Sequence, residues 1–405
     1  MSKNNILVKI TGSIAAYKSA YLISGLVQRG FNVKTVVTPS SLNFIGKATL
    51  EGLTGNRVYS DSFEDGTMMS HIDLAKWADL TIIAPADANT INKLASGIAD
   101  NLLTSLFLAH DMNKPYIISP AMNTTMYEHP TTRKSLSLLK SWGIYILPTD
   151  EGRLACGDEG KGKLLDPEEI LTHVIRILNK KNAPKKILIT SGGTKEKIDT
   201  VRYISNMSTG RTGSVIADYL FMRGHHITFV KSKDSLSPSN SDETKIYENF
   251  EDLNQILKEE LGKHKFDAII HLAAISDYSP EKIIFTDSFL KLPLTEKLNS
   301  KNESLTIRLN RNQKIINKIK TWSLNEKIKL IGFKLVDDNL NNTEKELILN
   351  KMFSEAKTDL IVYNSLLDRN TDAQTNFELI NMNGNVTISI NAIDLAKSLE
   401  KFLED

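Results

Sequence analysis

The chain has 405 residues, of which 41% are hydrophobic and 24% are charged. This composition is typical of a globular protein and excludes a largely disordered one, and the length predicts two domains rather than one. Fifty basic against 48 acidic residues leave a formal charge of +2, so the overall charge does not favour a nucleic-acid partner.

The first half of the chain alternates short apolar segments with segments of helical periodicity. Strands are predicted at residues 5–11, 32–38, 78–86 and 114–123. Helices are predicted at residues 15–29, 90–110 and 164–178. Such alternation predicts a parallel sheet with helices on both faces.

The second half restarts the same pattern after a polar, basic segment at 179–186 that contains Pro184 and predicts a linker. A strand at 186–194 ends in glycines, and a helix and a further strand follow between 209 and 230. We therefore predict two α/β domains, 1–182 and 183–405, each with its own glycine-rich loop.

Cysteine usage and hydropathy indicate the compartment. Cys156 is the only cysteine, which excludes an intramolecular disulfide and fits a reducing environment. Lys9 and Lys18 interrupt the apolar amino terminus, and no apolar stretch approaches the roughly 18 residues that span a bilayer. We expect a cytoplasmic protein that has no membrane partner.

Several polar stretches of the first domain follow predicted strands, where open parallel sheets bind their ligands. "TGSIAAYK" at 11–18 is a tight turn that suits a phosphate, but it lacks the GxGxxG pattern, which disfavours an NAD oxidoreductase. His71 precedes a helix, Asn123 follows a strand, and Cys156 lies among glycines that predict a mobile or tightly turned loop. Taken singly, each residue is also compatible with ordinary capping or turn chemistry.

Taken together, these stretches point to a family. The ordered set "TGSIAAYK", "SHIDLAKWAD", "APADANTINKLA", "PAMNTTMY" and "ACGDEGKGKL" resembles the flavin-dependent phosphopantothenoylcysteine decarboxylases. The whole chain resembles the bifunctional phosphopantothenoylcysteine decarboxylase/phosphopantothenate-cysteine ligases of coenzyme A biosynthesis. The resemblance implies a flavodoxin-like FMN domain of the HFCD flavoprotein family, followed by a Rossmann-like ligase domain.

The resemblance also implies roles for residues of the first domain. It implies that FMN is held by Thr11, Gly12, Ser13, Pro85, Ala86 and Asn89. His71 would assist oxidative decarboxylation, and Met122 with Asn123 would position the substrate carboxylate. The flavin would oxidise the cysteinyl thiol to a thioaldehyde that serves as an electron sink for loss of CO2. Cys156, on a flap that closes over the site, would then donate the last proton.

In the second domain, "SGGTKEKIDTVRYISNMSTGRTG" at 191–213 has two glycine-rich turns around basic and amide residues. This pattern suits phosphates, and by itself it also fits a dinucleotide site. A loop without function would leave Arg202 and Arg211 to repel each other with no evident compensation.

The family resemblance implies a specific ligase reaction. The 4'-phosphopantothenate carboxylate attacks a nucleoside triphosphate, pyrophosphate leaves, and the amine of cysteine attacks the acyl-nucleotide. Arg202 and Asn206 would contact that intermediate, and Mg2+ and a lysine would neutralise phosphate charge. The implied nucleotide contacts are Ala273, Ala274, Asp277, Phe333 and Lys357. No Mg2+ ligands are assigned.

The chain departs from the usual bacterial pattern after Asp277. Lys297 in "EKLNS" fits the ligase lysine best because "LTIRL" follows it, and Lys282 in "PEKI" is the alternative. "IGFKLVDD", with Phe333, is closer to the eukaryotic-type ligases, so ATP stays open beside CTP. Lys357 can also be read as an ordinary helix-end lysine.

Three alternatives differ in class from this interpretation. A catalytically silent regulatory flavoprotein is disfavoured by the presence of both His71 and Cys156. A flavin prenyltransferase or peptidyl-cysteine decarboxylase would have no use for the second domain. The NAD oxidoreductase lacks its fingerprint. Family analogy further implies a homo-oligomer in which subunits share the flavin site.

Overall fold

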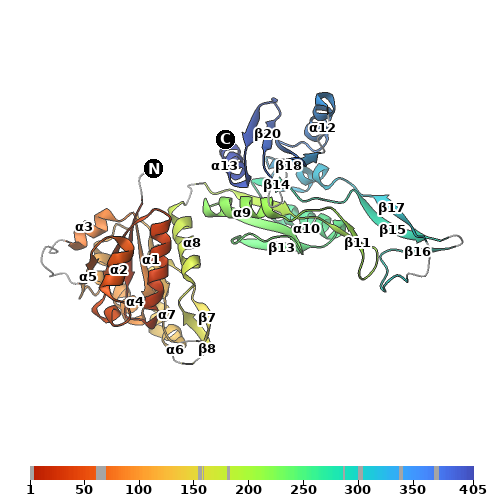
Figure 1. The fold of residues 1–405 in the computed structure, drawn as a ribbon. Helices are drawn as coiled ribbons and strands as arrows, with labels where there is room; N and C mark the ends of the chain where they lie inside the picture. Colours follow the sequence, from red (N-terminus) through yellow and green to blue (C-terminus); the bar gives the residue numbers. More distant parts are fainter. Residues whose placement is uncertain are drawn as a thin grey trace. The chain divides into compact units, whose positions relative to one another are not determined.

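The computed structural model of the chain describes residues 4–60, 70–153, 157, 159–179, 183–285, 288–299, 304–336, 341–368 and 374–405. Cys156 lies outside the described residues. The chain divides into two compact units, Met1–Asn179 and Lys180–Asp405, which are described separately below (Figure 1). Within the described ranges, no helix is both long and apolar enough to cross a membrane.

The first unit is built on a six-stranded parallel sheet with the order β3-β2-β1-β4-β5-β6. Its strands are β1 Asn5–Ile10, β2 Asn32–Val37, β3 Val58–Tyr59, β4 Leu80–Ala86, β5 Tyr116–Pro120 and β6 Tyr145–Ile146. The hairpin that contains the predicted flap consists of β7 Asp150–Arg153 and β8 Glu159–Lys163. The helices are η1 Ile14–Tyr17, α1 Lys18–Gln28, η2 Pro39–Asn43, α2 Lys47–Thr54, α3 Ser70–Trp77, α4 Ala88–Ala95, α5 Leu102–Leu108, α6 Thr124–Glu128, α7 Pro130–Ser141 and α8 Pro167–Leu178.

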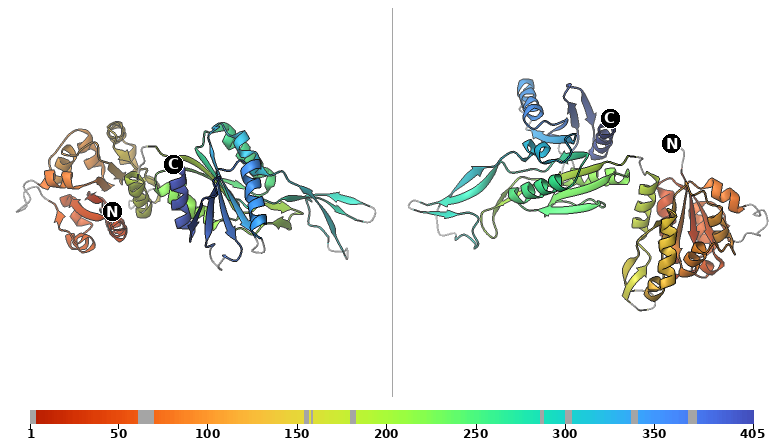
Figure 2. Two further views of the ribbon diagram at one scale, coloured as in Figure 1. Left: turned by 90° about the horizontal axis from the view of Figure 1, so that it is seen from above. Right: turned by 180° about the vertical axis from the view of Figure 1, so that it is seen from behind.

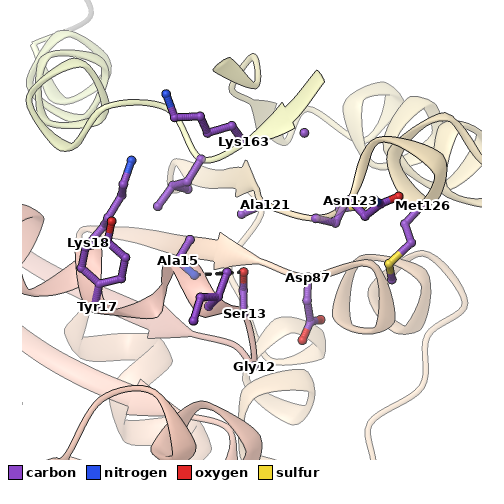
Figure 3. Close-up of a pocket in the computed structure, with 14 residues that line it drawn as sticks. Gly12, Ser13, Ala15, Tyr17, Lys18, Asp87, Ala121, Asn123, Met126 and Lys163 are labelled. Carbon is purple, nitrogen blue, oxygen red and sulfur yellow. Dashed lines mark hydrogen bonds between the residues drawn. The ribbon is translucent and has the colours of Figure 1, made fainter. Parts of the chain in front are cut away.

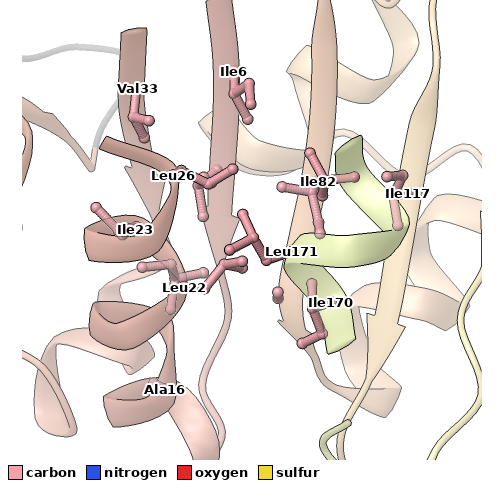
Figure 4. Packing of buried hydrophobic residues seen from close by; sticks show 14 of the residues in the cluster. Ile6, Ala16, Leu22, Ile23, Leu26, Val33, Ile82, Ile117, Ile170 and Leu171 are labelled. Carbon is pink, nitrogen blue, oxygen red and sulfur yellow. The ribbon is translucent and has the colours of Figure 1, made fainter. Parts of the chain in front are cut away.

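Strand alternation sorts the core of this unit into two layers. Ile6 and Ile82 face a cluster completed by α1, α2 and α8, in which Leu171 packs against the sheet (Figure 4). Leu7 and Ile83 face the opposite cluster, which α3, α4, α5 and α7 cover. The predicted parallel sheet with helices on both faces is therefore confirmed.

The single helix predicted over 90–110 is wrong, because the structure has two helices there. The first helix, α4, ends before Gly97, whose φ of +70° is a left-handed conformation that favours glycine. The second helix, α5, starts from a capping box in which Asn101 and Thr104 bond each other's backbone N–H groups. A stop signal and a start signal therefore divide a segment whose hydrophobic pattern is continuous.

The second unit has an eight-stranded sheet with the order β13-β12-β9-β14-β18-β19-β20-β21. Its strands are β9 Lys186–Ser191, β12 His226–Ser232, β13 Glu243–Tyr247, β14 Ala268–His271, β18 Lys329–Val336, β19 Leu360–Ser365, β20 Phe377–Asn381 and β21 Val386–Ser389. The first six are parallel, whereas β20 and β21 are antiparallel to their neighbours. The helices are α9 Arg211–Met222, α10 Phe250–Lys263, η3 Ile315–Asn317, α11 Ile319–Trp322, α12 Asn342–Glu355 and α13 Ala392–Glu404.

Helices again cover both faces of this sheet. Core residues of α9 and α13 pack on one face, and those of α10 and α11 pack on the other. A three-stranded antiparallel arm extends away from the sheet in both views of Figure 2. The arm consists of β15 Tyr278–Ile284, β16 Phe289–Lys291 and β17 Thr306–Arg311, and a further pair, β10 Lys195–Lys197 and β11 Tyr203–Ser205, lies in the same unit.

Candidate functional site

The first unit has a cavity of about 440 Å3 at the carboxyl ends of its central strands (Figure 3). It is lined by Gly12, Ser13, Ile14, Ala15, Tyr17, Lys18, Asp87, Ala121, Met122, Asn123, Met126, Gly162, Lys163 and Leu164. These residues come from the loops after β1, β4 and β5 and from the end of β8. This is the sheet edge at which parallel α/β folds bind ligands.

Hydrogen bonds fix the loops that form the floor of this cavity. The Thr11 hydroxyl donates to the Pro85 carbonyl at 2.8 Å and accepts the Asp87 N–H at 2.9 Å. Asp87 in turn caps α4 by accepting the Thr90 N–H at 2.7 Å. Thr11 thereby joins the ends of β1 and β4 behind the cavity wall, where it is fully buried.

The β7–β8 hairpin is attached to the loop after β5. The Met122 N–H donates to the Gly162 carbonyl at 2.9 Å, and the Thr124 hydroxyl donates to the Lys161 carbonyl at 2.8 Å. A Cβ atom on Gly162 would lie 2.4 Å from the Met122 carbonyl oxygen, and the φ of Gly162 is +119°. Only glycine allows this approach, which brings the base of the hairpin to the cavity.

An ion pair links the two strands at the base of the hairpin. Lys163 Nζ lies 2.8 Å from Asp150 Oδ2 across β7 and β8. This hydrogen bond lowers the pKa of the Asp150 carboxyl and raises that of the Lys163 ammonium. The Lys18 and Lys163 side chains extend toward the same side of the cavity (Figure 3). Lys18 thus offers a cation to an acidic ligand, whereas the charge of Lys163 is compensated by Asp150.

Some of the predicted flavin residues line this cavity and others do not. Gly12, Ser13, Met122 and Asn123 line it, and Asn123 also caps α6 by accepting the Thr125 N–H at 2.8 Å. Thr11, His71, Pro85, Ala86 and Asn89 are not among the lining residues. His71 is the second residue of α3 and is half-buried.

Sequence reasoning did not single out ten of the lining residues. They are Ile14, Ala15, Tyr17, Lys18, Asp87, Ala121, Met126, Gly162, Lys163 and Leu164. Lys18 and Asp87 belong to the quoted stretches "TGSIAAYK" and "APADANTINKLA", and each lies at the start of a helix. That position was the signal that could have identified them. No local signal identifies Lys163, because the hairpin pairing brings it to the cavity.

The second unit has a cavity of about 650 Å3 between the start of α9 and the carboxyl ends of the sheet. It is lined by Ser191, Met207, Ser208, Thr209, Gly210, Arg211, Thr212, Gly213, Asp234, Leu236, Leu272, Ala273, Ala274, Phe333, Leu335, Asn364, Gln374 and Phe377. The first turn of α9 presents backbone N–H groups that have no partner within the helix. Asp234 is paired with Lys195, and this hydrogen bond lowers the pKa of the Asp234 carboxyl.

The predicted nucleotide residues Ala273, Ala274 and Phe333 line this cavity. Asn206 precedes the lining residue Met207, and its Nδ2 donates to the Ile275 carbonyl at 3.0 Å. Asn206 thus holds the loop that continues from Ala274.

Asp277, the remaining predicted contact in that loop, does not line the cavity. It forms an ion pair with Lys314, and its carbonyl accepts the Asn312 N–H at 2.8 Å. The end of the loop is therefore held by the segment that follows β17.

The expectation that Arg202 has no compensating charge is wrong. Its Nη1 lies 3.1 Å from Oδ2 of Asp199, a carboxylate whose side chain has no exposed surface. The same Oδ2 atom accepts the Leu298 N–H at 3.0 Å, and Arg202 Nη1 donates to the Leu298 carbonyl at 3.4 Å. The fold therefore places the segment of Lys297 next to Arg202, although the two are far apart in sequence.

Three candidate lysines lie outside the lining of the cavity. Lys297 is exposed in the loop after β16. Lys282 lies on β15 with its Nζ 4.8 Å from the centroid of the Phe289 ring. Lys357 follows α12 with a φ of +56°, the left-handed conformation of a residue just past a helix end, which fits the alternative reading of this lysine.

Comparison with known proteins first shows which protein families the two parts of the chain match. Residues 1–179 match the family described as Flavoprotein, and residues 182–398 match the DNA/pantothenate metabolism flavoprotein C-terminal domain. Among solved structures, the DNA/pantothenate metabolism flavoprotein from Streptococcus pneumoniae is 28% identical, with 54% of this chain and 98% of that chain covered and a TM-score of 0.47. The FMN-binding protein AtHal3 is 39% identical, with 42% and 95% covered and a TM-score of 0.39.

The full-length relatives identify the family. The coenzyme A biosynthesis bifunctional protein CoaBC of Bacillus subtilis is 34% identical over 90% of this chain and 87% of its own length. The CoaBC of Borreliella burgdorferi is 35% identical over 90% of each chain, and that of Thermococcus kodakarensis is 33% identical over 89% and 85%. The chain belongs to the CoaBC family of bifunctional coenzyme A biosynthesis proteins.

Proposed function

We propose that the chain converts 4'-phosphopantothenate and cysteine to 4'-phosphopantetheine in two steps. The second unit couples the substrates through an acyl-nucleotide, and the first unit decarboxylates the product. The observation that carries this proposal is similarity to CoaBC proteins along about 90% of the chain, together with one cavity in each unit. Similarity across both units also argues against the regulatory flavoprotein and the single-domain alternatives.

The lining of the first cavity fits FMN. The backbone and hydroxyl groups of Gly12 and Ser13 suit a phosphate, while Ile14, Met122 and Leu164 offer apolar surface to a flat ring. Its volume lies within the roughly 300–1,000 Å3 of small-molecule pockets. When bound, FMN supplies the two-electron chemistry that lets the carboxylate leave as CO2.

Residues of the chain would orient the substrate and handle protons. Asn123 and Met122 lie at the cavity where a substrate carboxylate would be held. The Asp150–Lys163 ion pair and the bond from Thr124 keep the hairpin base in place over this side of the cavity. Cys156, in the connection between β7 and β8, is proposed as the acid for the final proton transfer. His71 is proposed to assist the decarboxylation.

The second cavity supports the ligase half. The backbone N–H groups at the start of α9 and the guanidinium of Arg211 suit the triphosphate, and Asn206 and Arg202 are proposed to hold the acyl-nucleotide. Mg2+ and a lysine, Lys297 or Lys282, are proposed to neutralise the departing pyrophosphate. CTP is the proposed nucleotide, with ATP as the alternative, and the enzyme is proposed to act as a homo-oligomer in the cytoplasm.

Mass spectrometry of the complete reaction tests this proposal. The purified chain is incubated with 4'-phosphopantothenate, cysteine and Mg2+, and with CTP or ATP in parallel. Formation of 4'-phosphopantetheine, pyrophosphate and CMP or AMP is the expected result. Accumulation of phosphopantothenoylcysteine would contradict the decarboxylase half, and absence of any product in either tube would contradict both.

A further inference from the structure

The second cavity has two chemically different ends. Its lining residues follow the strand order from β9, with Ser191, through β14 and β18 to β19 and β20. Gly210, at the start of α9, accepts a hydrogen bond from Ser191 Oγ at 3.1 Å, so the phosphate-binding end lies at β9. Strands are spaced about 4.8 Å apart, which places β19 roughly 14 Å from β9. A nucleotide bound along the strand ends therefore carries its base to β18, β19 and β20.

This second end of the cavity combines aromatic rings with amide groups. Phe333 and Leu335 of β18 provide apolar surface, and the buried ring of Phe377 on β20 forms part of the wall. Asn364 of β19 and Gln374, three residues before Phe377, provide polar atoms. A nucleobase has apolar faces that stack on rings and an edge that amide groups can read.

Hydrogen bonds fix the orientation of the Gln374 amide. Its Nε2 donates to the Ser365 carbonyl at 2.8 Å and to the Thr375 carbonyl at 3.2 Å. Since both partners can only accept, the nitrogen and oxygen positions cannot be exchanged. Gln374 therefore offers the cavity only an acceptor, its Oε1 atom. In the part of the chain that the structure describes, neither this atom nor the Asn364 side chain has a hydrogen-bond partner.

We propose that Gln374 and Asn364 select a nucleobase that carries an exocyclic amino group, an inference that rests on the proposed ligase function. Gln374 Oε1 accepts a hydrogen bond from the amino group, and Asn364 Nδ2 donates to the neighbouring ring nitrogen. Cytosine and adenine both present this donor and acceptor side by side. Uracil, guanine and hypoxanthine present a carbonyl in place of the amino group, so two acceptors meet at Gln374, whose orientation is fixed.

Paired nucleotides that differ in this edge test the proposal. Ligase kcat/KM is measured on the full chain with CTP against UTP and with ATP against ITP, at fixed Mg2+, 4'-phosphopantothenate and cysteine. A site built to bond an amino group rejects the analogue that lacks it, so we expect CTP to exceed UTP and ATP to exceed ITP by at least about tenfold. Equal use within both pairs would overturn the proposal.

A substitution assigns the discrimination to Gln374. In Gln374→Met, which keeps the length of the side chain, the CTP:UTP ratio should fall at least about fivefold, through a higher KM for CTP. The KM for 4'-phosphopantothenate should not change. Gln255→Met, at an exposed position of α10, is the matched control and should keep the wild-type ratio. An unchanged CTP:UTP ratio in Gln374→Met would show that Gln374 does not select the base.

Binding separates failure of this proposal from failure of the ligase function. Calorimetric titration of the wild-type chain with CTP and with UTP needs no turnover. A CTP preference without ligation would contradict the proposed function and support the base selection. Ligation with no preference between CTP and UTP in binding or turnover would support the proposed function and contradict the base selection.

Discussion

Lys9 Nζ lies 3.1 Å from the hydroxyl of Tyr116 in the interior of the first unit, where both side chains are essentially without exposed surface. The same nitrogen donates to the Leu103 carbonyl at 3.2 Å. Burial lowers the pKa of the Lys9 ammonium well below its usual range and raises that of the Tyr116 hydroxyl. Burial therefore disfavours the charged form of both groups, which meet in a hydrogen bond inside an apolar cluster.

This burial predicts a pH dependence of stability. In the unfolded chain Lys9 is protonated below its usual pKa of about 10.4, whereas in the folded chain it is neutral over part of that range. The unfolded state then binds more protons, so the free energy of unfolding rises with pH by up to about 1.4 kcal/mol per unit up to about pH 10. Lys9→Met should remove this slope.

Denaturant unfolding between pH 7 and 10 measures the slope. A Trp322→Phe background leaves Trp77 and Trp142, both in the first unit, as the fluorescence reporters. Comparison with Lys9→Met cancels the other titrating groups. Equal slopes in both proteins would mean that Lys9 stays protonated in the folded chain.

The contact between Gly162 and Met122 predicts a selective loss of decarboxylation. In Gly162→Ala the new Cβ would lie 2.4 Å from the Met122 carbonyl oxygen, and the φ of +119° adds strain of about 1–3 kcal/mol. The hairpin base must then shift, and we expect decarboxylation of supplied phosphopantothenoylcysteine to fall at least about tenfold. Gly97→Ala is the matched control, because its φ is also positive but its Cβ would meet no atom within 4 Å. Similar losses in both variants would attribute the effect to backbone strain alone.

Cys156 gives a prediction from the sequence. Cys156→Ser removes the only thiol and leaves a hydroxyl that is a far weaker acid. We expect CO2 release to continue while the yield of 4'-phosphopantetheine falls about a hundredfold or more, as for loss of a general acid. Simultaneous measurement of CO2 and product by mass spectrometry tests this role, and normal product yield would refute it.

The buried carboxylate of Asp199 predicts a change confined to the ligase. Its two oxygens accept the backbone N–H groups of Val201, Arg202 and Leu298 as well as the Arg202 guanidinium. In Asp199→Asn, one oxygen becomes an amide that cannot accept, so Arg202 and the segment at Leu298 lose a shared anchor. Ligase kcat/KM should fall at least about tenfold, a loss of ~1.4 kcal/mol, with decarboxylation unchanged. Glu259→Gln on α10 serves as the control, and a parallel loss of both activities would indicate general destabilisation.

Local signals in the sequence were sufficient for the parallel strands and the loops at their ends. Gly12, Ser13 and Asn123 lie at the ends of apolar strands, and the family resemblance assigned them to the site. The parts that were missed depend on pairings between distant segments. Lys163 reaches its cavity through an antiparallel hairpin, and Gln374 reaches the other through a strand that reverses direction at the edge of the sheet. Neither pairing leaves a periodic pattern in the sequence.

Asn206 gives a prediction that separates the two chemical steps of the ligase. Its Nδ2 donates to the Ile275 carbonyl, which holds the loop between Ala274 and Asp277 against the start of the second cavity. In Asn206→Asp, a carboxylate oxygen would face that carbonyl oxygen, so the contact becomes repulsive and the loop moves. The first step, attack of the substrate carboxylate on the nucleotide, does not use this contact. The second step, attack of the cysteine amine, needs the acyl group to be held beside this loop.

We therefore expect Asn206→Asp to form the acyl-nucleotide and pyrophosphate, and to release phosphopantothenoylcysteine about a hundredfold more slowly than the wild type. Acid quenching followed by mass spectrometry detects the accumulated intermediate directly. Asn383→Asp, at an exposed turn residue between β20 and β21, introduces the same charge away from the cavity and should ligate normally. Unchanged ligation in Asn206→Asp would remove Asn206 from the site, and loss of pyrophosphate release would move its role to the first step.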